Sequence, residues 1–379
     1  MRVLVDATAI PADRGGVGRY VDELVAALGR QGVDLVVAVQ ARDVAGMSAR
    51  SPGARVVPAA RRTLGRAARL AWEQVRLPGL LRRERADVLL SPHYTMPVRA
   101  GVPVVVTLHD ATFFSHPQVH SGLKGRFFRT ATRVAVRRAA ALVVPSAATR
   151  DEVLRHVGGD PARFHVAHHG VDTARFHPVP PQEVVRVRAA LGLGDRPYVA
   201  FLGTLEPRKN VPALVRGWVE ASRDRSQPPA LLLAGAPGWD EEVDPALAAV
   251  PEHLDARRLG YLPFEDLAPF LSGAEVVAYP ALGEGFGLPV LEAMACGAAV
   301  LTTCELSLPE VGGDAVAYCG TDAASIATVL GDLLDDPPRR ADLARRGVER
   351  AAGFTWDAAA AVHVAAFEQA LVQARRPAR

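Results

Sequence analysis

Short apolar runs alternate with longer segments in which apolar residues recur every three or four positions, nearly from one end of the chain to the other. The runs lack the strict apolar–polar alternation of a strand with one solvated face, so we predict strands that are buried on both faces. The predicted strands are Val3–Val5, Leu35–Val39, Val88–Leu90, Val104–Leu108, Leu142–Val144, Tyr198–Leu202, Ala230–Leu233, Glu275–Ala278, Ala298–Leu301 and Val316–Tyr318. Buried strands separated by helices are typical of doubly wound parallel sheets, and the predicted fold class is therefore α/β.

The chain divides into two predicted domains. Its 379 residues exceed the roughly 250–300 residues that one hydrophobic core supports. The segment His177–Gln182 contains three prolines, and we expect a stiff extended linker there because proline is excluded from helix interiors and central strands. The predicted domains are residues 1–178 and 179–355, and a C-terminal helix in residues 356–379 is expected to pack back on the first domain.

Composition excludes several classes of protein. With 49% hydrophobic and 22% charged residues, the chain is not intrinsically disordered. Cys296, Cys304 and Cys319 form no CxxC pair, which favours reduced thiols over a disulfide scaffold or a zinc site. No run is long and apolar enough for a signal peptide or a membrane span. We therefore expect a cytoplasmic protein, attached at most to the inner face of the membrane.

Basic residues are concentrated in the first predicted domain, although the net charge is only +3. Arginine recurs between Arg50 and Arg85, and the segment Lys124–Arg138 carries no acidic residue. Solvated helix faces in an arginine-rich protein explain this pattern, and so does an anionic partner such as lipid head groups or a phosphorylated acceptor. Peripheral membrane association through this domain therefore stays open, and nucleic acid is not among the expected partners.

The segment Ala278–Gly297, AYPALGEGFGLPVLEAMACG, carries the most chemical information. It predicts a strand end, a glycine loop with Glu284, and a helix with Pro289 in its first turn and Glu292 about one turn in. Amides at a helix start bind diphosphate oxygens, and glycines let the backbone approach them closely. Two carboxylates suit the two sets of hydroxyls on a sugar nucleotide. The alternative is that an acidic residue near a helix start only stabilises the helix dipole.

Four other motifs surround this segment in the same chain. They are GGVGRY at Gly15–Tyr20, TLHD at Thr107–Asp110, GTLEPRKN at Gly203–Asn210 and SLPEVGGDA at Ser307–Ala315. Their combination and order resemble the retaining glycosyltransferases of family 4, also called group 1, over nearly the whole chain, and most of all bacterial mannosyltransferase-like members. The resemblance implies the GT-B fold, in which two Rossmann-like domains face each other across a cleft.

The resemblance also implies roles for individual residues. The implied catalytic residues are His109, Arg208, Lys209 and Glu284. The implied donor-binding residues are Gly15, Gly16, Gly203, Leu262, Gly285, Phe286, Gly287, Leu288 and Glu292. In similar enzymes the histidine contacts the transferred sugar, the early glycines contact donor phosphate or acceptor, and the segment containing Leu262 holds the nucleobase.

Arg208 and Lys209 also point to this chemistry on physical grounds. Negative charge builds on the diphosphate as the bond to the sugar breaks, and two adjacent cations stabilise it. A merely solvated pair is disfavoured, since cations at a helix start oppose the helix dipole. No Asp-x-Asp triplet occurs and the histidines lack ligand spacing, so we expect no metal and no cofactor besides the nucleotide-diphosphate sugar, which is a co-substrate.

The expected activity is transfer of a hexose, first of all mannose from GDP-mannose, to an acceptor hydroxyl on a glycan, a lipid-linked glycan or a small molecule. Retention of configuration, by attack on the face that the diphosphate leaves, is implied by the resemblance. The alternatives are a two-domain sugar-nucleotide epimerase, a glycan phosphorylase and a non-enzymatic nucleotide-sugar-binding protein. An NAD-dependent dehydrogenase is disfavoured because Val21 stands at the third glycine position of the dinucleotide fingerprint.

Overall fold

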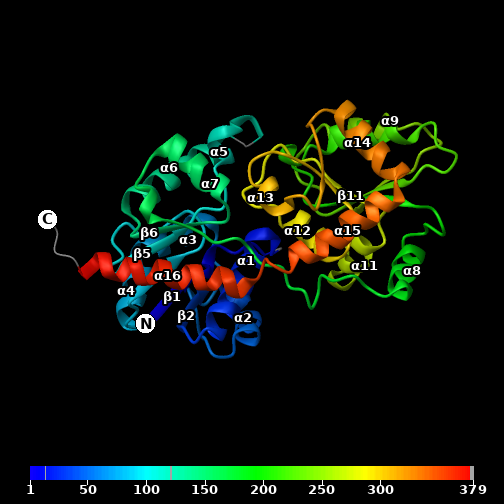
Figure 1. The fold of residues 1–379 in the computed structure, drawn as a ribbon. Helices are drawn as coiled ribbons and strands as arrows, with labels where there is room; N and C mark the ends of the chain where they lie inside the picture. The colour runs from blue at the N-terminus through cyan, green and yellow to red at the C-terminus, as the bar shows by residue number, and fades with distance from the viewer. Residues whose placement is uncertain (13, 120–121, 376–379) are drawn as a thin grey trace. The chain divides into compact units, whose positions relative to one another are not determined.

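The computed structural model describes residues 1–12, 14–119 and 122–375. They form two compact units, one made of residues 1–170 together with the C-terminal segment from Thr355, and one made of Val171–Phe354. Residues 376–379 of the expected C-terminal helix lie outside the described residues. Each unit is built around one parallel sheet with helices on both faces (Figure 1).

The first unit contains a sheet of seven parallel strands in the order β3-β2-β1-β4-β5-β6-β7. The strands are β1 (Arg2–Asp6), β2 (Asp34–Val39), β3 (Arg55–Pro58), β4 (Val88–Ser91), β5 (Val104–Thr107), β6 (Ala141–Val144) and β7 (Phe164–Val166). The helices are α1 (Gly15–Arg30), α2 (Val44–Arg50), α3 (Arg66–Val75), α4 (Leu77–Arg83), α5 (Thr112–Ser115), α6 (Gly122–Arg138), α7 (Ala147–Val157) and α16 (Trp356–Arg375).

Alternate side chains of β1 enter two separate cores, one on each face of the first sheet. Val3 and Val5 pack with α1 and α16 on one face, whereas Leu4 packs with α3 and α4 on the other. Helix α16 contacts α1, β5, β6 and β7 (Figure 1). The last helix of the chain therefore covers the first sheet, although the whole second unit precedes it in the sequence.

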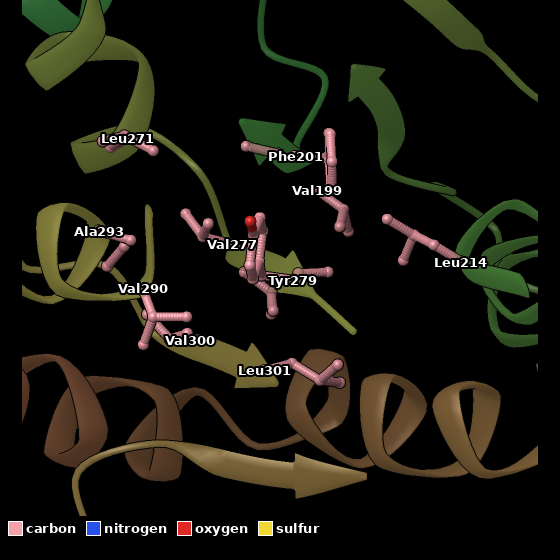
Figure 2. Packing of buried hydrophobic residues seen from close by; sticks show 14 of the residues in the cluster. Val199, Phe201, Leu214, Leu271, Val277, Tyr279, Val290, Ala293, Val300 and Leu301 are labelled. Atoms are coloured by element: carbon pink, nitrogen blue, oxygen red, sulfur yellow. The ribbon is translucent and has the colours of Figure 1, made fainter. Parts of the chain in front are cut away.

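The second unit contains a sheet of six parallel strands in the order β10-β9-β8-β11-β12-β13. The strands are β8 (Tyr198–Leu202), β9 (Ala230–Ala234), β10 (Ala256–Gly260), β11 (Val276–Tyr279), β12 (Val300–Thr303) and β13 (Ala317–Cys319). The helices are α8 (Pro181–Ala190), α9 (Val211–Ser222), α10 (Val243–Ala248), α11 (Leu267–Ser272), α12 (Leu288–Ala295), α13 (Leu308–Gly312), α14 (Ala323–Asp335) and α15 (Pro337–Ala351). Figure 2 shows Tyr279, at the end of β11, among the buried apolar side chains of this core.

Both sheets share one topology, in which the strand order reverses beside the first strand. The reversal lies between β1 and β4 in the first sheet and between β8 and β11 in the second. Loops that leave the carboxyl ends of two such strands diverge and open a crevice, which is the usual ligand site of an open α/β sheet. The loops after β8 and β11 are therefore the expected ligand site of the second unit.

All the predicted strands are present, with ends that differ by a residue or two. The strands that the apolar pattern left out are β3, β7 and β10, which lie at sheet edges and, apart from the buried Phe164 of β7, carry half-buried or exposed side chains. An edge strand has one neighbour and more contact with water, so its sequence lacks a continuous apolar run.

The proline-rich segment differs from the stiff extended linker that we expected, because its second half begins a helix. Pro181 begins α8, where its fixed φ suits the first helical turn. Pro178 packs against Gly297, and Val179 is half-buried against the core of the second unit. The units divide after Gly170 rather than at residue 178, because residues from Val171 onward pack with the second unit.

The chain crosses twice between the two units, at neighbouring points. The amide of Val171 donates to the carbonyl of Phe354 over 3.1 Å. A Cβ on Gly170 would lie 2.2 Å from the backbone nitrogen of Trp356, so only glycine fits at this crossing.

Among the described residues, no helix combines the length and apolar character needed to cross a bilayer.

Replacing Gly217 by alanine should destabilise the second unit. Gly217 lies where α9 packs on α14, and an added Cβ would meet the Ala323 carbonyl oxygen and Ile326 Cγ2 at 2.8 Å. We expect Gly217→Ala to lower the free energy of unfolding by about 1–3 kcal/mol through overpacking. Gly331→Ala on α14, where a Cβ meets nothing within 4 Å, should instead raise it by up to about 1 kcal/mol, since alanine favours helix. Urea unfolding of both variants checks this, and equal effects would contradict it.

Candidate functional site

The loop after β8 holds two cations in a fixed turn. Pro207–Lys209 form one turn of 3-10 helix that ends at Asn210, whose φ of 59° is left-handed. The Asn210 side-chain amide donates to the carbonyls of Pro280 (3.1 Å) and Thr321 (2.7 Å). The carbonyl of Arg208 also accepts from the amide of Leu282 over 2.9 Å. The loop after β8 is thus tied directly to the loop after β11.

Hydroxyl side chains from β12 and the loop after it fix the backbone of the loop after β11. Thr302 donates to the Tyr279 carbonyl over 2.8 Å, and Thr303 donates to the Ala281 carbonyl over 2.6 Å. The buried hydroxyl of Ser307 lies 2.7 Å from the Glu284 carbonyl and 2.8 Å from that of Phe286. A loop without regular structure is therefore held at successive carbonyls around Glu284, which gives its side chain a defined direction.

Glu284 is the centre of a buried ion cluster. One carboxylate oxygen accepts from Lys209 and from the Tyr279 hydroxyl, the latter at 2.7 Å, and the other forms an ion pair with Arg208. Lys209 also donates to the Tyr279 hydroxyl, and Arg208 lies 3.6 Å from Glu206. Both Glu284 and Lys209 are only 8% exposed. A buried carboxylate shared by two cations is compensated for its desolvation.

The charges of this cluster set its protonation states. Burial by itself would raise the pKa of Glu284, but the charges of Arg208 and Lys209 outweigh it and lower that pKa to about 2. Burial and the neighbouring Arg208 lower the pKa of Lys209, and Glu284 opposes that shift. Burial and the Glu284 charge raise the pKa of Tyr279 well above its usual value. Glu284 is therefore ionised and Tyr279 neutral throughout the physiological range.

Helix α12 begins beside this cluster with the features that its sequence predicts. Gly287 precedes the helix at a φ of 109°, and a Cβ there would lie 2.9 Å from Leu308 Cδ2. Pro289 stands in the first turn, and Leu288 before it is half-buried. Glu292 lies in the second turn and is only 3% exposed. The positive end of the helix dipole thus faces the loop that carries Glu284.

The side chain of Phe286 packs in the core of the second unit. Its side chain is 4% exposed, and its ring meets that of Phe354 edge-on at 5.9 Å. We expected donor contact from this residue, and that contact stays a prediction. Large aromatic side chains in such a loop anchor it to the core, and the pattern of the motif does not distinguish anchoring from contact.

Gly203 and Leu262 lie in loops at the same edge of the second sheet. Gly203 follows β8, and its amide donates to the Ala234 carbonyl over 2.9 Å. A Cβ on Gly235 would come within 2.1 Å of the Gly203 carbonyl oxygen, so the loops after β8 and β9 pass in close backbone contact. Leu262 is half-buried just beyond β10, with its side chain against the core.

Gly285 is buried next to Glu284 in the loop after β11, and the other remaining predicted residues belong to the first unit. His109 follows β5 and is half-buried, with Nε2 2.7 Å from the Pro92 carbonyl. Burial lowers the pKa of His109, although the Pro92 carbonyl opposes this shift. Gly15 and Gly16, from which we expected contact with donor phosphate or acceptor, form the exposed first turn of α1. A Cβ on either glycine would meet nothing within 4 Å, so the start of α1 is open.

The structure thus brings together Arg208, Lys209 and Glu284, and it adds residues for which we predicted no role. Tyr279, Asn210, Thr303 and Ser307 hold this cluster and its loops in place. Their positions at strand ends and in the quoted motifs were visible in the sequence, but the pairing of β11 with β8 and β12 was not. Within the described ranges, no group of three or more His, Cys, Asp or Glu side chains is arranged to hold a metal ion.

Comparison with known sequences gives consistent matches over both units. Residues 14–175 match the family described as Glycosyltransferase Family 4, and residues 196–336 match the family described as Glycosyl transferases group 1. The chain is 32% identical to O-antigen chain mannosyltransferase B of Escherichia coli over 280 residues, which cover 73% of each chain. It is 31% identical to alpha-maltose-1-phosphate synthase of Mycolicibacterium smegmatis over 383 residues, 94% of this chain and 96% of that one.

Comparison with solved structures shows the same fold at lower identity. The structure of Anabaena Alr3699/HepE in complex with UDP aligns with a TM-score of 0.77 and 18% identity, covering 97% of this chain and 100% of that chain. The structure of WaaG, a glycosyltransferase involved in lipopolysaccharide biosynthesis, aligns with a TM-score of 0.74 and 16% identity, covering 97% and 98% of the two chains.

Replacing Glu284 by glutamine should destabilise the protein in a pH-dependent way. The variant keeps the shape of the side chain but leaves two buried cations without their carboxylate, so we expect a loss of about 3–5 kcal/mol at neutral pH. The pKa of Glu284 is lower in the folded state, about 2 against an ordinary 4.5. The contribution of its charge is therefore complete above about pH 4.5 and is lost as the pH falls toward 2.

Chemical unfolding of both proteins between pH 7 and pH 3 measures this difference. Glu349→Gln serves as a control, because Glu349 is 65% exposed in its ion pair with Arg345 and should change stability by less than about 1 kcal/mol. A difference between wild type and Glu284→Gln that does not shrink in acid would contradict the electrostatic explanation.

Proposed function

The chain belongs to the family 4, group 1 glycosyltransferases with the GT-B fold, and from that premise we propose that it transfers mannose from GDP-mannose, with retention of configuration, to an acceptor hydroxyl of a glycan. The observation that carries the proposed sugar transfer, whatever the sugar, is the Arg208–Glu284–Lys209 cluster at the strand-order reversal of the second sheet. Membership of this family leaves no reason to retain the epimerase or the non-enzymatic binding protein as alternatives.

Arg208 and Lys209 stabilise the departing diphosphate. Their turn follows β8 and is held rigidly by Asn210, so the two cations are in place before a donor arrives. Donors and charges that need no rearrangement stabilise a developing charge most effectively. In the proposed mechanism these two cations perform the task that a divalent metal performs in other nucleotide-sugar enzymes, and no metal is needed.

Glu284 orients the sugar and takes no part as a base or a nucleophile. A carboxyl group with a pKa of about 2 is a poor base near neutral pH, and its oxygens are already engaged by Lys209, Tyr279 and Arg208. The acceptor proton therefore goes to a departing phosphate oxygen, on the same face as the attack. Glu292 and the first turn of α12 bind the rest of the donor, namely the ribose hydroxyls and the diphosphate.

The choice of mannose rests on a relative rather than on geometry. The Escherichia coli relative is named a mannosyltransferase, and it is 32% identical over 73% of each chain. Other relatives are named alpha-maltose-1-phosphate synthase and D-inositol 3-phosphate glycosyltransferase. The donor test therefore covers GDP-, UDP- and ADP-linked sugars, with GDP-mannose expected to be the preferred donor.

The purified protein should release a nucleoside diphosphate selectively from one donor in the panel. We expect GDP release from GDP-mannose, and we expect Glu284→Ala to lower the rate by at least about a hundredfold, because it removes the group that orients the sugar. Coupled detection of free nucleoside diphosphate gives the rates. Glu241→Ala, at an exposed position of the same unit, is the matched control and should keep the wild-type rate.

Two results separate the donor from the class of enzyme. Release from a UDP- or ADP-linked sugar that Glu284→Ala abolishes would replace the proposed sugar and keep the mechanism. No release from any donor, together with no thermal stabilisation by GDP, UDP or ADP, would overturn the proposed function.

The proposed acceptor is a lipid-linked glycan, and the support for it is the exposed face of α6. Leu123 is 85% exposed and Phe127, one turn later, is 40% exposed. Exposed Lys124, Arg126 and Arg133 accompany them, and the helix carries no acidic residue. Apolar side chains flanked by cations suit insertion at an anionic membrane surface.

Anionic vesicles should therefore bind the protein through α6. Leu123→Ser with Phe127→Ser removes the two exposed apolar side chains, and we expect at least about a tenfold loss of binding to phosphatidylglycerol vesicles. Co-sedimentation measures it, with neutral phosphatidylcholine vesicles expected to bind weakly. Val185→Ser replaces a side chain that is 63% exposed in the other unit and should change nothing. Equal binding by all three proteins would rule out α6 as the contact.

A further inference from the structure

Tyr20, the last residue of the GGVGRY motif, lies at the centre of a buried ring cluster in the first unit. It is 1% exposed, so it does not reach a substrate. Its ring meets that of His109 edge to face, with centroids 4.9 Å apart and an interplanar angle of 85°. The rings of His169 (4.8 Å) and Trp356 (6.1 Å) pack on its other sides. The aromatic body of Tyr20 therefore forms one wall of the space that His109 occupies.

The imidazole of His109 is held in one tautomer. Its Nε2 lies 2.7 Å from the Pro92 carbonyl, which only accepts, so Nε2 carries the proton. Nδ1 of the neutral ring then keeps its lone pair and accepts a hydrogen bond from a hydroxyl. The direction of that lone pair depends on the tilt of the ring, which the packed rings of Tyr20 and Tyr94 (5.9 Å) determine.

The hydroxyl of Tyr20 is itself fixed from two sides. It lies 2.9 Å from the Thr107 hydroxyl and 2.8 Å from Nε2 of His363 on α16. The other ring nitrogen of His363, Nδ1, lies 2.7 Å from the Ala359 carbonyl and must donate to it. Nε2 of His363 therefore accepts from Tyr20, and Tyr20 accepts from Thr107. Burial lowers the pKa of His363 to about 4, so its ring is neutral at physiological pH and the hydrogen bonds keep this one direction.

These contacts connect α16, the C-terminal helix, to the end of β5, the strand that precedes His109. Thr107 is the last residue of β5, two positions before His109, and Tyr20 touches both Thr107 and the His109 ring. His363 is 0% exposed and lies 343 positions from Tyr20 in the sequence. Burying two polar side chains lowers the stability of the folded protein unless they form hydrogen bonds, and Tyr20 and His363 form theirs.

We propose that Tyr20 and His363 are positioning residues for His109, and that α16 thereby completes the catalytic centre of the first unit. The proposal rests on the proposed function and adds to it that the Nδ1 lone pair of His109 accepts a hydrogen bond from a hydroxyl of the transferred sugar. Tyr20 sets the tilt of the imidazole through its ring, and His363 holds Tyr20 through its hydroxyl. Loss of the hydroxyl lets the ring of Tyr20, and with it His109, leave the reactive geometry.

A purely structural role predicts different kinetics. If the cluster only stabilises the core, its loss lowers the fraction of folded enzyme and leaves the properties of the folded molecules unchanged. If it positions His109, folded enzyme turns over more slowly. Donor affinity resides mainly with the second-unit residues in the proposed function, so KM for the nucleotide sugar should change little.

The test compares Tyr20→Phe, His363→Leu and His363→Gln with wild type, as full-length protein. Tyr20→Phe keeps the ring and removes only the hydroxyl. His363→Leu removes the acceptor, whereas the side-chain oxygen of His363→Gln restores an acceptor for Tyr20. We expect kcat per folded enzyme to fall about tenfold or more in Tyr20→Phe and His363→Leu, since small displacements of a catalytic group have effects of this size. KM for the donor should stay within about twofold, and His363→Gln should recover most of the loss.

The outcomes separate this inference from the proposed function. His109→Ala is measured alongside, and thermal unfolding of each variant gives the folded fraction. Transfer by wild type that falls in His109→Ala, together with the expected split between kcat and KM, supports the inference. The inference is overturned, and the proposed function kept, if transfer falls in His109→Ala but stays within twofold of wild type in Tyr20→Phe. Equal activity of His363→Leu and His363→Gln would overturn the inference in the same way. Absence of transfer by wild type from any donor fails the proposed function itself.

Discussion

Every strand in both sheets runs parallel to its neighbours, and this constraint determines where the candidate site lies. Parallel strands send all the loops that follow them to one edge, so residues separated by more than seventy positions, such as Lys209 and Glu284, meet there. The order of the strands then selects the place along that edge. Because β8 and β11 lie side by side at the reversal of strand order, their loops provide the two cations and the carboxylate.

The electrostatic balance of the cluster follows from its burial. Lys209 and Glu284 are almost completely removed from water, which either residue would tolerate poorly without the other. Arg208 adds a second positive charge and keeps Glu284 ionised. The hydroxyls of Thr302, Thr303 and Ser307 hold the loop that carries this carboxylate. The geometry is therefore present without a bound donor, as the proposed stabilisation of a leaving diphosphate requires.

The motifs of the sequence indicated the main site residues but not how each acts. Arg208, Lys209 and Glu284 lie together, and Pro289 and Glu292 occupy their expected places in α12. The side chain of Phe286 packs in the core, and Gly15 and Gly16 begin a helix. Neither placement could be read from the motifs alone. Tyr20 was visible at the end of its motif, but its partner His363 lies in a helix whose sequence has no motif.

The sequence by itself determined the α/β class, the buried strands and the chemistry of the cationic and acidic loops, because these depend on local periodicity and on the types of residue present. The strand order, the half-polar edge strands β3, β7 and β10, and the return of α16 to the first sheet were decided only by the tertiary structure. These features come from packing between segments distant in the chain. A local pattern of residues predicts that one face of a helix or strand is apolar, but it does not predict which other apolar face will pack against it.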